Sequence, residues 1–145
     1  MNVTIISPIT YVAAHYEAVC QLMKQLTVRN IVLSEVEYAQ MVASPSNRLF
    51  LLLYEERVVG MLTVGMYASP TGTKAWIEDV VVEEGLRGSG FGRRLMDRAL
   101  EFCREKGIAT VYLTSNPKRV AANSLYQRMG FVRKETNMYK LELME

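Results

Sequence analysis

One stretch of the sequence, from Trp76 to Lys106, constrains the fold more than any other. Its first part, Trp76–Val82 (WIEDVVV), is rich in β-branched residues and is predicted to be a strand. A short turn follows, and the run RGSGFG at 87–92 then opens a segment whose apolar residues have helical spacing. Glycines in alternate positions are poor helix formers, since each costs about 1 kcal/mol relative to alanine. Their placement therefore indicates a helix N-terminus whose backbone N–H groups are approached closely.

Positive charge gathers around this helix start. A helix N-terminus has unpaired N–H groups and about half a unit of positive charge. Arg87, Arg93 and Arg94 flank this one. The combination predicts a binding site for phosphate or pyrophosphate. Because the net charge of the 145-residue chain is only +2, the positive charge is local, and no binding of nucleic acid is expected.

Two common nucleotide-binding patterns do not fit the glycine run. A Walker loop needs a lysine directly after its last glycine, whereas Gly90 is followed by Phe91. A dinucleotide fingerprint needs G-x-G-x-x-G, and Arg93 occupies the third glycine position here. The strand–helix unit also lies late in a chain whose other strands form hairpins, so a Rossmann site is not expected.

The remaining pattern of apolar residues predicts one domain over residues 1–145, with an α/β fold built on a mixed sheet. Short turns between the second, third and fourth strands predict an antiparallel meander. The helix that follows the fourth strand predicts a right-handed crossover to a parallel fifth strand. The expected strands are 3–6, 49–54, 58–66, 75–82, 110–114, 131–134 and 138–143, and the expected helices are 10–26, 35–43 (opened by a capping box at 34–37), 87–106 and 119–129.

The sequence contains neither a metal-binding motif nor a pattern typical of an exported or membrane protein. Cys20 and Cys103 both fall on apolar helix faces without a CxxC motif, so buried, reduced thiols and no metal site are expected. His15, the one histidine, has no local acid or nucleophile and is expected to be structural. No apolar run approaches the ~20 residues that span a bilayer, and a signal-peptide pattern is absent, which predicts a cytoplasmic protein without membrane contact.

The glycine run resembles a known family motif. The segment 87–92 matches the Arg/Gln-x-x-Gly-x-Gly/Ala loop of the GCN5-related N-acetyltransferases, the GNAT family. Further along, Leu125–Phe131 (LYQRMGF) resembles the family's Leu-Tyr-x-x-x-Gly-Phe signature, and the order of elements is also similar. On these grounds the whole chain is identified as a member. The resemblance implies the GNAT fold: a central, mostly antiparallel sheet of six to seven strands with a splayed parallel pair and about four helices. The strand 77–82 also resembles, locally, that of glucosamine-phosphate acetyltransferases.

The resemblance implies acetyl-CoA as co-substrate, and the cysteine pattern above predicts no metal. Backbone N–H groups from Gly88 to Gly92 would hold the pyrophosphate, with Arg87 and Arg93 adding charge. The backbone of 80–82 would pair with the pantetheine arm, and an N–H near Val80 would stabilise the oxyanion. The implied CoA-binding residues are Val80, Val81, Val82, Arg87, Gly88, Ser89, Gly90, Phe91, Gly92, Arg93, Asn116, Arg119, Asn123 and Tyr126.

Two residues are the candidates for acid–base chemistry. An amine with the pKa of lysine, roughly 10.4, needs about 4 to 5 kcal/mol to lose its proton at pH 7. Glu78 and Asp79 are possible bases, and because neighbours on a strand point to opposite faces, only one is expected to face the thioester. The resemblance favours Glu78 as base or water-positioner, with a structural carboxylate as the alternative. Tyr126 stands where the family has its general acid, and packing on Phe131 is its alternative.

The helix before the tyrosine departs from the family pattern. Many members carry an asparagine seven residues before the tyrosine, where this chain has Arg119. Asn116 and Asn123 lie nearby and are candidates for holding pantetheine amides, while Arg119 is a candidate for a CoA phosphate. Solvent-exposed charge is the alternative for Arg119.

The expected reaction is transfer of an acetyl group to a primary amine of a small molecule by direct attack in a ternary complex. Amino sugars, aminoglycosides, polyamines and amino acids are the candidate acceptors. A protein N-terminal or lysine acetyltransferase and a non-catalytic CoA-binding module are the alternatives. The two N-terminal helices, the segments 27–33 and 68–74 and the tail 135–144 are expected to select the acceptor. Pairing of C-terminal strands in a homodimer is left open.

Overall fold

The computed structural model describes residues 2–26 and 29–144. Thr27, part of the segment expected to select the acceptor, and Val28 lie outside the described residues. The chain divides into two compact units, Met1–Thr114 and Ser115–Glu145, and each is described by itself.

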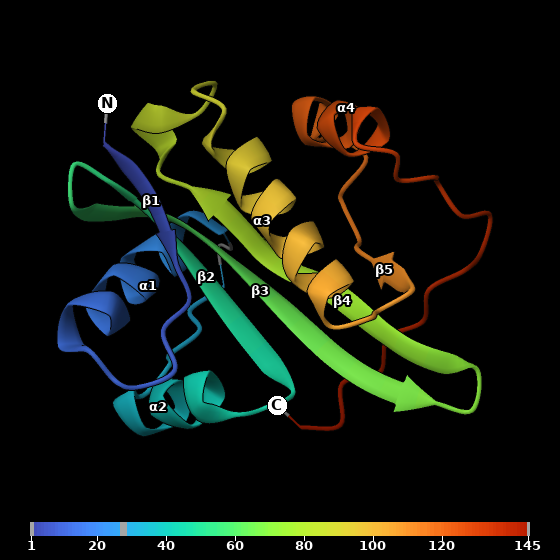
Figure 1. Cartoon of the computed structure of the whole chain (residues 1–145), viewed down its shortest axis with the longest axis horizontal. Coiled ribbons are helices and arrows are strands. Elements are labelled where there is room, and N and C mark those ends of the chain that lie inside the picture. The colour runs from blue at the N-terminus through green and yellow to red at the C-terminus, as the bar shows by residue number, and fades with distance from the viewer. Residues whose placement is uncertain (1, 27–28, 145) are drawn as a thin grey trace. The chain divides into compact units, whose positions relative to one another are not determined.

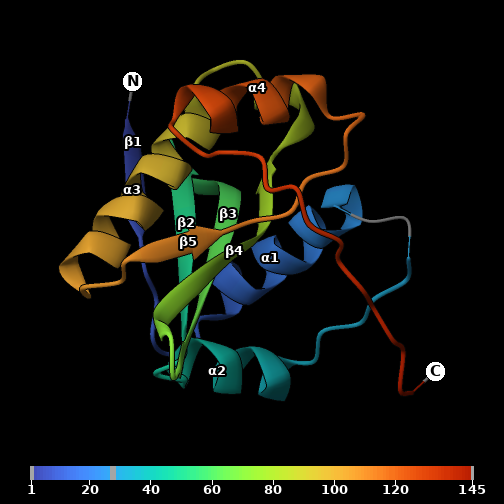
Figure 2. The ribbon, with the colours of Figure 1, turned by 90° about the vertical axis from the view of Figure 1, so that its right-hand side faces the viewer.

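The first unit is a mixed sheet of five strands with helices on both faces (Figure 1, Figure 2). The strand order is β1-β2-β3-β4-β5. The pairs β1–β2, β2–β3 and β3–β4 are antiparallel, and the pair β4–β5 is parallel. The predicted meander and parallel crossover are therefore confirmed. The elements are β1 (Val3–Ile6), α1 (Ala13–Leu26), α2 (Glu35–Ala43), β2 (Asn47–Tyr54), β3 (Arg57–Ser69), β4 (Gly72–Val82), the short 3₁₀ helix η1 (Glu84–Leu86), α3 (Phe91–Glu105) and β5 (Thr110–Tyr112).

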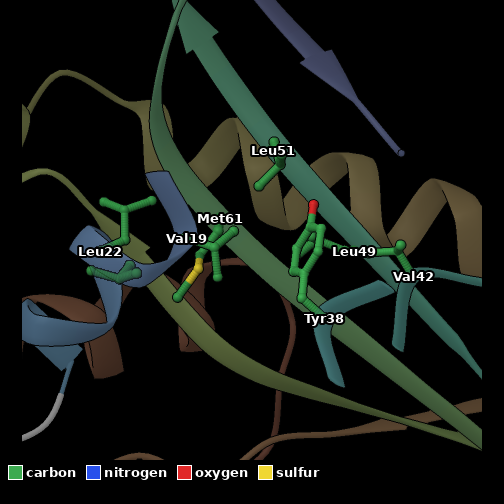
Figure 3. Packing of buried hydrophobic residues seen from close by; sticks show 8 residues of the cluster. Val19, Leu22, Tyr38, Val42, Leu49, Leu51 and Met61 are labelled. Carbon is green, nitrogen blue, oxygen red and sulfur yellow. The ribbon is translucent and has the colours of Figure 1, made fainter. Parts of the chain in front are cut away.

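The face of the sheet towards α1 and α2 has its own apolar cluster (Figure 3). Side chains of the two helices pack there on alternate residues of the central strands, and the cluster comprises Val19, Leu22, Tyr38, Val42, Leu49, Leu51, Met61 and Val81. The capping box predicted at the start of α2 is confirmed: the Glu37 N–H donates to the Ser34 hydroxyl, and the Glu37 carboxylate accepts the Ser34 N–H. The cap and the buried cluster together fix α2.

The opposite face is covered by α3. Phe102 of this helix packs edge-on against Phe50 of β2, with ring centroids 5.6 Å apart. Gly60 of β3 lets the helix approach closely, since a Cβ there would lie 3.1 Å from the Leu95 side chain. The middle of β2 is buried on both faces, as predicted. This burial explains its continuous run of apolar residues. The helix begins at Phe91, later than the predicted residue 87, because Gly88 and Gly90 have left-handed backbones.

The second unit contains α4 (Val120–Arg128) and an irregular tail. The strands predicted at 131–134 and 138–143 are wrong: the described part of this tail has no regular structure, and the sheet has five strands where six to seven were expected. Apolar tail side chains such as Tyr139, Leu141 and Leu143 are 80–87% exposed. A strand needs a second strand with which to form hydrogen bonds, and the described residues of this unit contain no strand. No helix in the described part of the chain is long and apolar enough to cross a bilayer.

Candidate active site

A β-bulge interrupts β4 in the middle of the predicted catalytic strand. Thr63 of β3 lies opposite Glu78, and Met61 lies opposite Val81, so β4 has one residue more than β3 between these pairs. Asp79 lies within this extra length and has a left-handed backbone, with φ +54°. The bulge thus falls on the residues expected to face the thioester.

The bulge reverses the alternation of side chains along β4. Met61 and Val81 both belong to the cluster facing α1 and α2. Thr63 lies two residues from Met61 and therefore shares its face, as does its partner Glu78. Glu78 and Val81, three residues apart, then lie on the same face, which a regular strand does not allow. Regular alternation along β4 therefore breaks between Glu78 and Val81. Glu78 and Asp79 are both exposed, and which of them faces the thioester stays a prediction.

The two parallel strands diverge beside the bulge. β5 pairs with β4 only over Lys74–Trp76, and Trp76 stacks on Tyr112 at a centroid distance of 5.1 Å. β4 then continues to Val82 with no β5 partner among the described residues. Figure 1 shows the long β4 arrow running past the short β5. The splayed parallel pair is thereby confirmed, and the β4 backbone from 77 onward has an edge that β5 does not cover.

The carboxylates at the bulge differ in their surroundings. Partial desolvation raises the pKa of the Asp79 carboxyl above its ordinary value. Glu78, beside it, is exposed and lies on the face of α1 and α2. Two carboxyl groups therefore stand next to an irregular stretch of backbone, an arrangement suited to moving a proton from a bound amine.

The glycine loop leads from η1 into α3 and leaves its amides open. Gly88 and Gly90 both have φ +85°, and a Cβ at either would meet no atom within 4 Å. The Ser89 hydroxyl donates to the Leu86 carbonyl and closes the loop on η1. Gly90 is the N-cap and provides no side-chain cap. The Arg94 N–H donates to the Gly90 carbonyl at 3.1 Å, so the amides at 91–93 precede the helical ladder.

Around the loop, one aromatic side chain is buried in the core and two arginine side chains lie on the surface. Phe91 is 2% exposed and packs on Tyr54 at a centroid distance of 5.4 Å, which fixes the start of α3 in the core. Arg93 Nε lies 3.2 Å from the Asp97 carboxylate, so part of its charge is neutralised on the helix surface. Arg87 is exposed. The loop can therefore hold an anion by backbone amides, with Arg87 the better placed of the two cations to add charge.

A cavity of about 260 Å³ lies beside α1 in the first unit. Tyr16, whose hydroxyl donates to the Leu33 carbonyl at 2.6 Å, forms part of its wall. The remaining wall is Cys20, Met23, Lys24, Arg29, Asn30, Ile31, Val32 and Leu33. This cavity adjoins the segment that the sequence associates with acceptor choice, but composition alone could not locate it.

In the second unit, the candidate asparagines build the turn that precedes α4. The Asn116 Oδ1 accepts the Lys118 N–H at 2.9 Å. The Asn123 Nδ2 donates to the carbonyls of Asn116 and Arg119, at 2.9 and 2.8 Å. Arg119 is exposed at the N-cap of α4. Contacts of these residues with CoA remain predictions, and the asparagines have a structural role as well.

Tyr126 is the buried residue of α4 in the second unit. Its ring packs edge-on against Phe131 at a centroid distance of 6.1 Å, the contact expected from the structural alternative. Burial raises the pKa of its phenol, and the nearby positive charge of Arg119 opposes this rise in part. The hydroxyl is thus protonated at neutral pH, the form that a general acid needs. Its catalytic role remains a prediction.

Comparisons with known proteins agree with this geometry. The sequence profile of the "Acetyltransferase (GNAT) family" matches residues 16–131. A streptothricin acetyltransferase from Streptomyces lavendulae is 44% identical over 55 residues, which are 38% of this chain and 29% of that protein. Glucosamine 6-phosphate N-acetyltransferase 1 of Oryza sativa subsp. japonica is 34% identical over 67 residues, covering 46% of this chain and 39% of the rice protein.

Solved structures share the fold over the full chain. The crystal structure of glucosamine-6-phosphate N-acetyltransferase from Arabidopsis thaliana superposes with a TM-score of 0.82 at 18% identity, covering 97% of this chain and 99% of that one. The sequence alignments, by contrast, span less than half the length of the curated relatives named above. The profile match, which covers most of the chain, and the splayed, bulged sheet together lead to one conclusion: this chain belongs to the GNAT acetyltransferase family.

Proposed function

We propose that the protein transfers the acetyl group of acetyl-CoA to a primary amine of a small molecule. The observation that carries this proposal is an open, bulged β4 edge followed, after η1 and the glycine loop, by an α3 N-terminus that has no side-chain cap. A thioester carbonyl, an extended amide arm and a pyrophosphate follow one another in acetyl-CoA in the same order. The donor therefore matches the chain's polar backbone groups from end to end.

The glycine loop is the proposed pyrophosphate site. The amides at 91–93 have no helical acceptor, and the helix dipole adds positive charge where they point. Gly88 and Gly90 keep the approach clear of side chains. Arg87 adds a cation. Arg93 adds only part of its positive charge, because its guanidinium is paired with the Asp97 carboxylate.

The open edge of β4 is the proposed site for the pantetheine arm and the thioester. The arm pairs with the backbone of 80–82, as an added strand would. The Val80 N–H donates to the thioester oxygen and stabilises its negative charge as the amine attacks; one such donor typically contributes 10²–10³ in rate. Since Val81 is buried in the core, side-chain packing and backbone binding coexist on this strand.

Proton transfers complete the reaction. Glu78 accepts a proton from the acceptor ammonium, directly or through water, which offsets the cost of about 4 to 5 kcal/mol at pH 7. The amine nitrogen then bonds to the carbonyl carbon, and the carbon–sulfur bond breaks. Tyr126 gives its phenolic proton to the leaving thiolate. The second nitrogen proton, lost as the amide forms, restores the Tyr126 phenol through water, and the proton held by Glu78 returns to solvent.

The acceptor class rests on the relatives and on the cavity beside α1. The relatives named above are a streptothricin acetyltransferase and a glucosamine 6-phosphate N-acetyltransferase, and both names give small-molecule substrates. The cavity of about 260 Å³ suits part of a small molecule, and Lys24 and Asn30 offer it polar contacts.

The test is a screen by thiol release with saturating acetyl-CoA. Amino sugars, aminoglycosides, polyamines and amino acids form one arm, and peptides with a free N-terminus or lysine form the other. Turnover in the small-molecule arm alone supports the proposal. Turnover with peptides alone assigns a protein acceptor instead. Saturable CoA binding without turnover in either arm would identify a non-catalytic CoA-binding module.

A further inference from the structure

We propose that Trp76 determines acceptor specificity: the open face of its indole is a platform for the sugar ring of an amino-sugar acceptor. The inference rests on the proposed function and deepens it by choosing one acceptor class. Trp76 lies on β4 two residues before Glu78, the proposed base. Side chains two residues apart on a strand stand on one face, roughly 7 Å apart. A sugar ring on Trp76 can therefore present its amine to that carboxylate.

The register of β3 and β4 places Trp76 and Glu78 on the side of the sheet that carries α1 and α2. Trp76 pairs with Gly65 of β3, and Glu78 pairs with Thr63. Both partners alternate along β3 with Met61, which belongs to the cluster facing α1 and α2. Helix α1 contacts β4 on this side (Figure 2). The indole and the proposed base thus share the side of the sheet on which the cavity beside α1 lies.

One face of the Trp76 indole is covered and the other is open. The Tyr112 ring stacks on the indole at a centroid distance of 5.1 Å and an interplanar angle of 25°. Tyr112 belongs to β5, whereas on the other side of β4 the neighbour of Trp76 is Gly65 of β3. A Cβ at Gly65 would meet no atom within 4 Å. The indole face turned towards β3 therefore borders open space.

Backbone and packing do not explain why position 65 is a glycine. Gly65 lacks the positive φ of glycines such as Gly72 and Gly88. No side chain approaches it either, in contrast to Gly60, where a Cβ would lie 3.1 Å from the Leu95 side chain. Glycine inside a strand weakens the strand, and it often marks a place where a ligand comes close to the backbone. Room for a ligand is the reason that remains.

The groups around this space match the chemistry of a sugar ring. A pyranose has a face of C–H groups and a rim of hydroxyls. The indole offers a broad apolar face, and the Thr63 hydroxyl and the Glu78 carboxylate offer hydrogen-bonding partners beside it. The exposed Glu78 carboxylate also complements the positive charge of the arriving ammonium. Because a rigid ring loses less freedom on binding than a flexible polyamine chain, an amino sugar is favoured.

Trp76 is the one tryptophan of the chain, so tryptophan fluorescence reports directly on ligands at the platform. The protein, saturated with CoA, is titrated with D-glucosamine, D-glucosamine 6-phosphate and neamine, and separately with the linear diamine putrescine. We expect a saturable change in emission with at least one amino sugar and none with putrescine. The N-acetyl derivative of that sugar should also change the emission, because the platform binds the ring and not the ammonium.

Gly65→Val fills the open space without altering the indole or Glu78. Valine suits a strand and would meet no atom at its Cβ, so the melting temperature should stay at or above the wild-type value. The Kd and KM of the responding sugar should rise about five- to hundredfold, as expected for overpacking, while the Kd of CoA stays within about twofold. Thr4→Ile is the matched control, since it adds bulk at an exposed position of β1, the opposite edge strand, and should change none of these values.

Trp76→Leu removes the aromatic face and separates binding from stability. If Trp76 binds the acceptor, the KM of the responding sugar rises about two- to tenfold, the range expected for the loss of one aromatic contact. Trp76→Phe keeps a ring and should have a smaller effect. If Trp76 only stabilises the sheet through Tyr112, Trp76→Leu lowers the melting temperature and leaves this KM unchanged.

Three results would overturn the inference. The first is an unchanged Trp76 emission with all three amino sugars, and the second is an equal sugar Kd in the wild type and Gly65→Val. The third is a response to putrescine without a response to any sugar, which assigns the platform to a linear cation. If no amine is acetylated but a sugar still changes the emission, the proposed function fails and the platform stands. If only peptides are acetylated and no sugar responds, the platform fails while acetyl transfer stands.

Discussion

Replacing Gly90 with alanine strains the glycine loop without creating a clash. Gly90 has φ +85° at the N-cap of α3, and a Cβ there would meet no atom within 4 Å. The cost is therefore conformational, about 1 to 2 kcal/mol for an L-residue held in this region. For a chain of this size, that cost corresponds to a fall of roughly 3 to 8 °C in melting temperature.

Ligand binding should respond more strongly than stability. If the loop relieves the strain by rotating, one amide at the start of α3 no longer points at the pyrophosphate. A hydrogen bond to a charged group contributes about 1.5 to 3 kcal/mol. Losing one raises the Kd for CoA roughly ten- to hundredfold. Titration calorimetry gives this Kd, and differential scanning calorimetry gives the melting temperature.

Gly107→Ala is the matched control. Gly107 lies just past the other end of the same helix and has φ +71°, and a Cβ at this position would also meet no atom within 4 Å. Both variants should lose similar stability, and only Gly90→Ala should weaken CoA binding. Equal weakening in both variants, or none in either, would refute the assignment of the loop as the pyrophosphate site.

Three further variants test the remaining roles. E78Q should lower kcat by about 10²–10⁴ with an unchanged melting temperature, while E84Q on the exposed η1 leaves both unchanged; a fully active E78Q removes Glu78 as the base. Y126F keeps the ring contact with Phe131 and should lower kcat by about 10²–10⁴ without loss of stability; undiminished turnover rejects the general acid. The Ser34 N–H lowers the pKa of Glu37, so its carboxylate stabilises the fold above the unfolded value of 4.5, and this stability is lost as pH falls through the folded pKa. The urea midpoints of wild type and E37Q should differ at neutral pH and converge in acid; a pH-independent difference contradicts the linkage.

Periodicity and turn chemistry predicted much of the first unit. The apolar face of α3, the capping box at Ser34 and the buried run of β2 all follow from local spacing. The glycine run predicted an anion site because positive φ and open amides are local properties. Such features need no knowledge of distant contacts.

The bulge was not predicted, because alternation assumes a regular strand. A residue count that differs between β3 and β4 arises from packing on two faces at once, which no single segment encodes. One signal was present: Asp79 tolerates left-handed backbone and interrupts an apolar run. The structural role of Asn123 was not predicted for a related reason, since the same amide side chain can shape a turn or hold a ligand.

In the C-terminal tail, the sequence pattern predicted a strand that the structure does not contain. Tyr139, Leu141 and Leu143 alternate with polar residues and predict a strand. Alternation specifies a face but not a partner, and the described part of the second unit contains no strand to pair with. Side-chain pattern alone was therefore insufficient.

The central claim is that backbone amides of the β4 bulge and the glycine loop hold acetyl-CoA. A ¹H–¹⁵N NMR titration with CoA, repeated with acetyl-CoA, tests it most directly. We predict saturable shifts at the amides of 88–93 with both ligands, a further shift at Val80 with acetyl-CoA, and none at Glu56 or Gly107. Saturable binding that leaves the amides of Val80 and 88–93 unmoved would contradict the account.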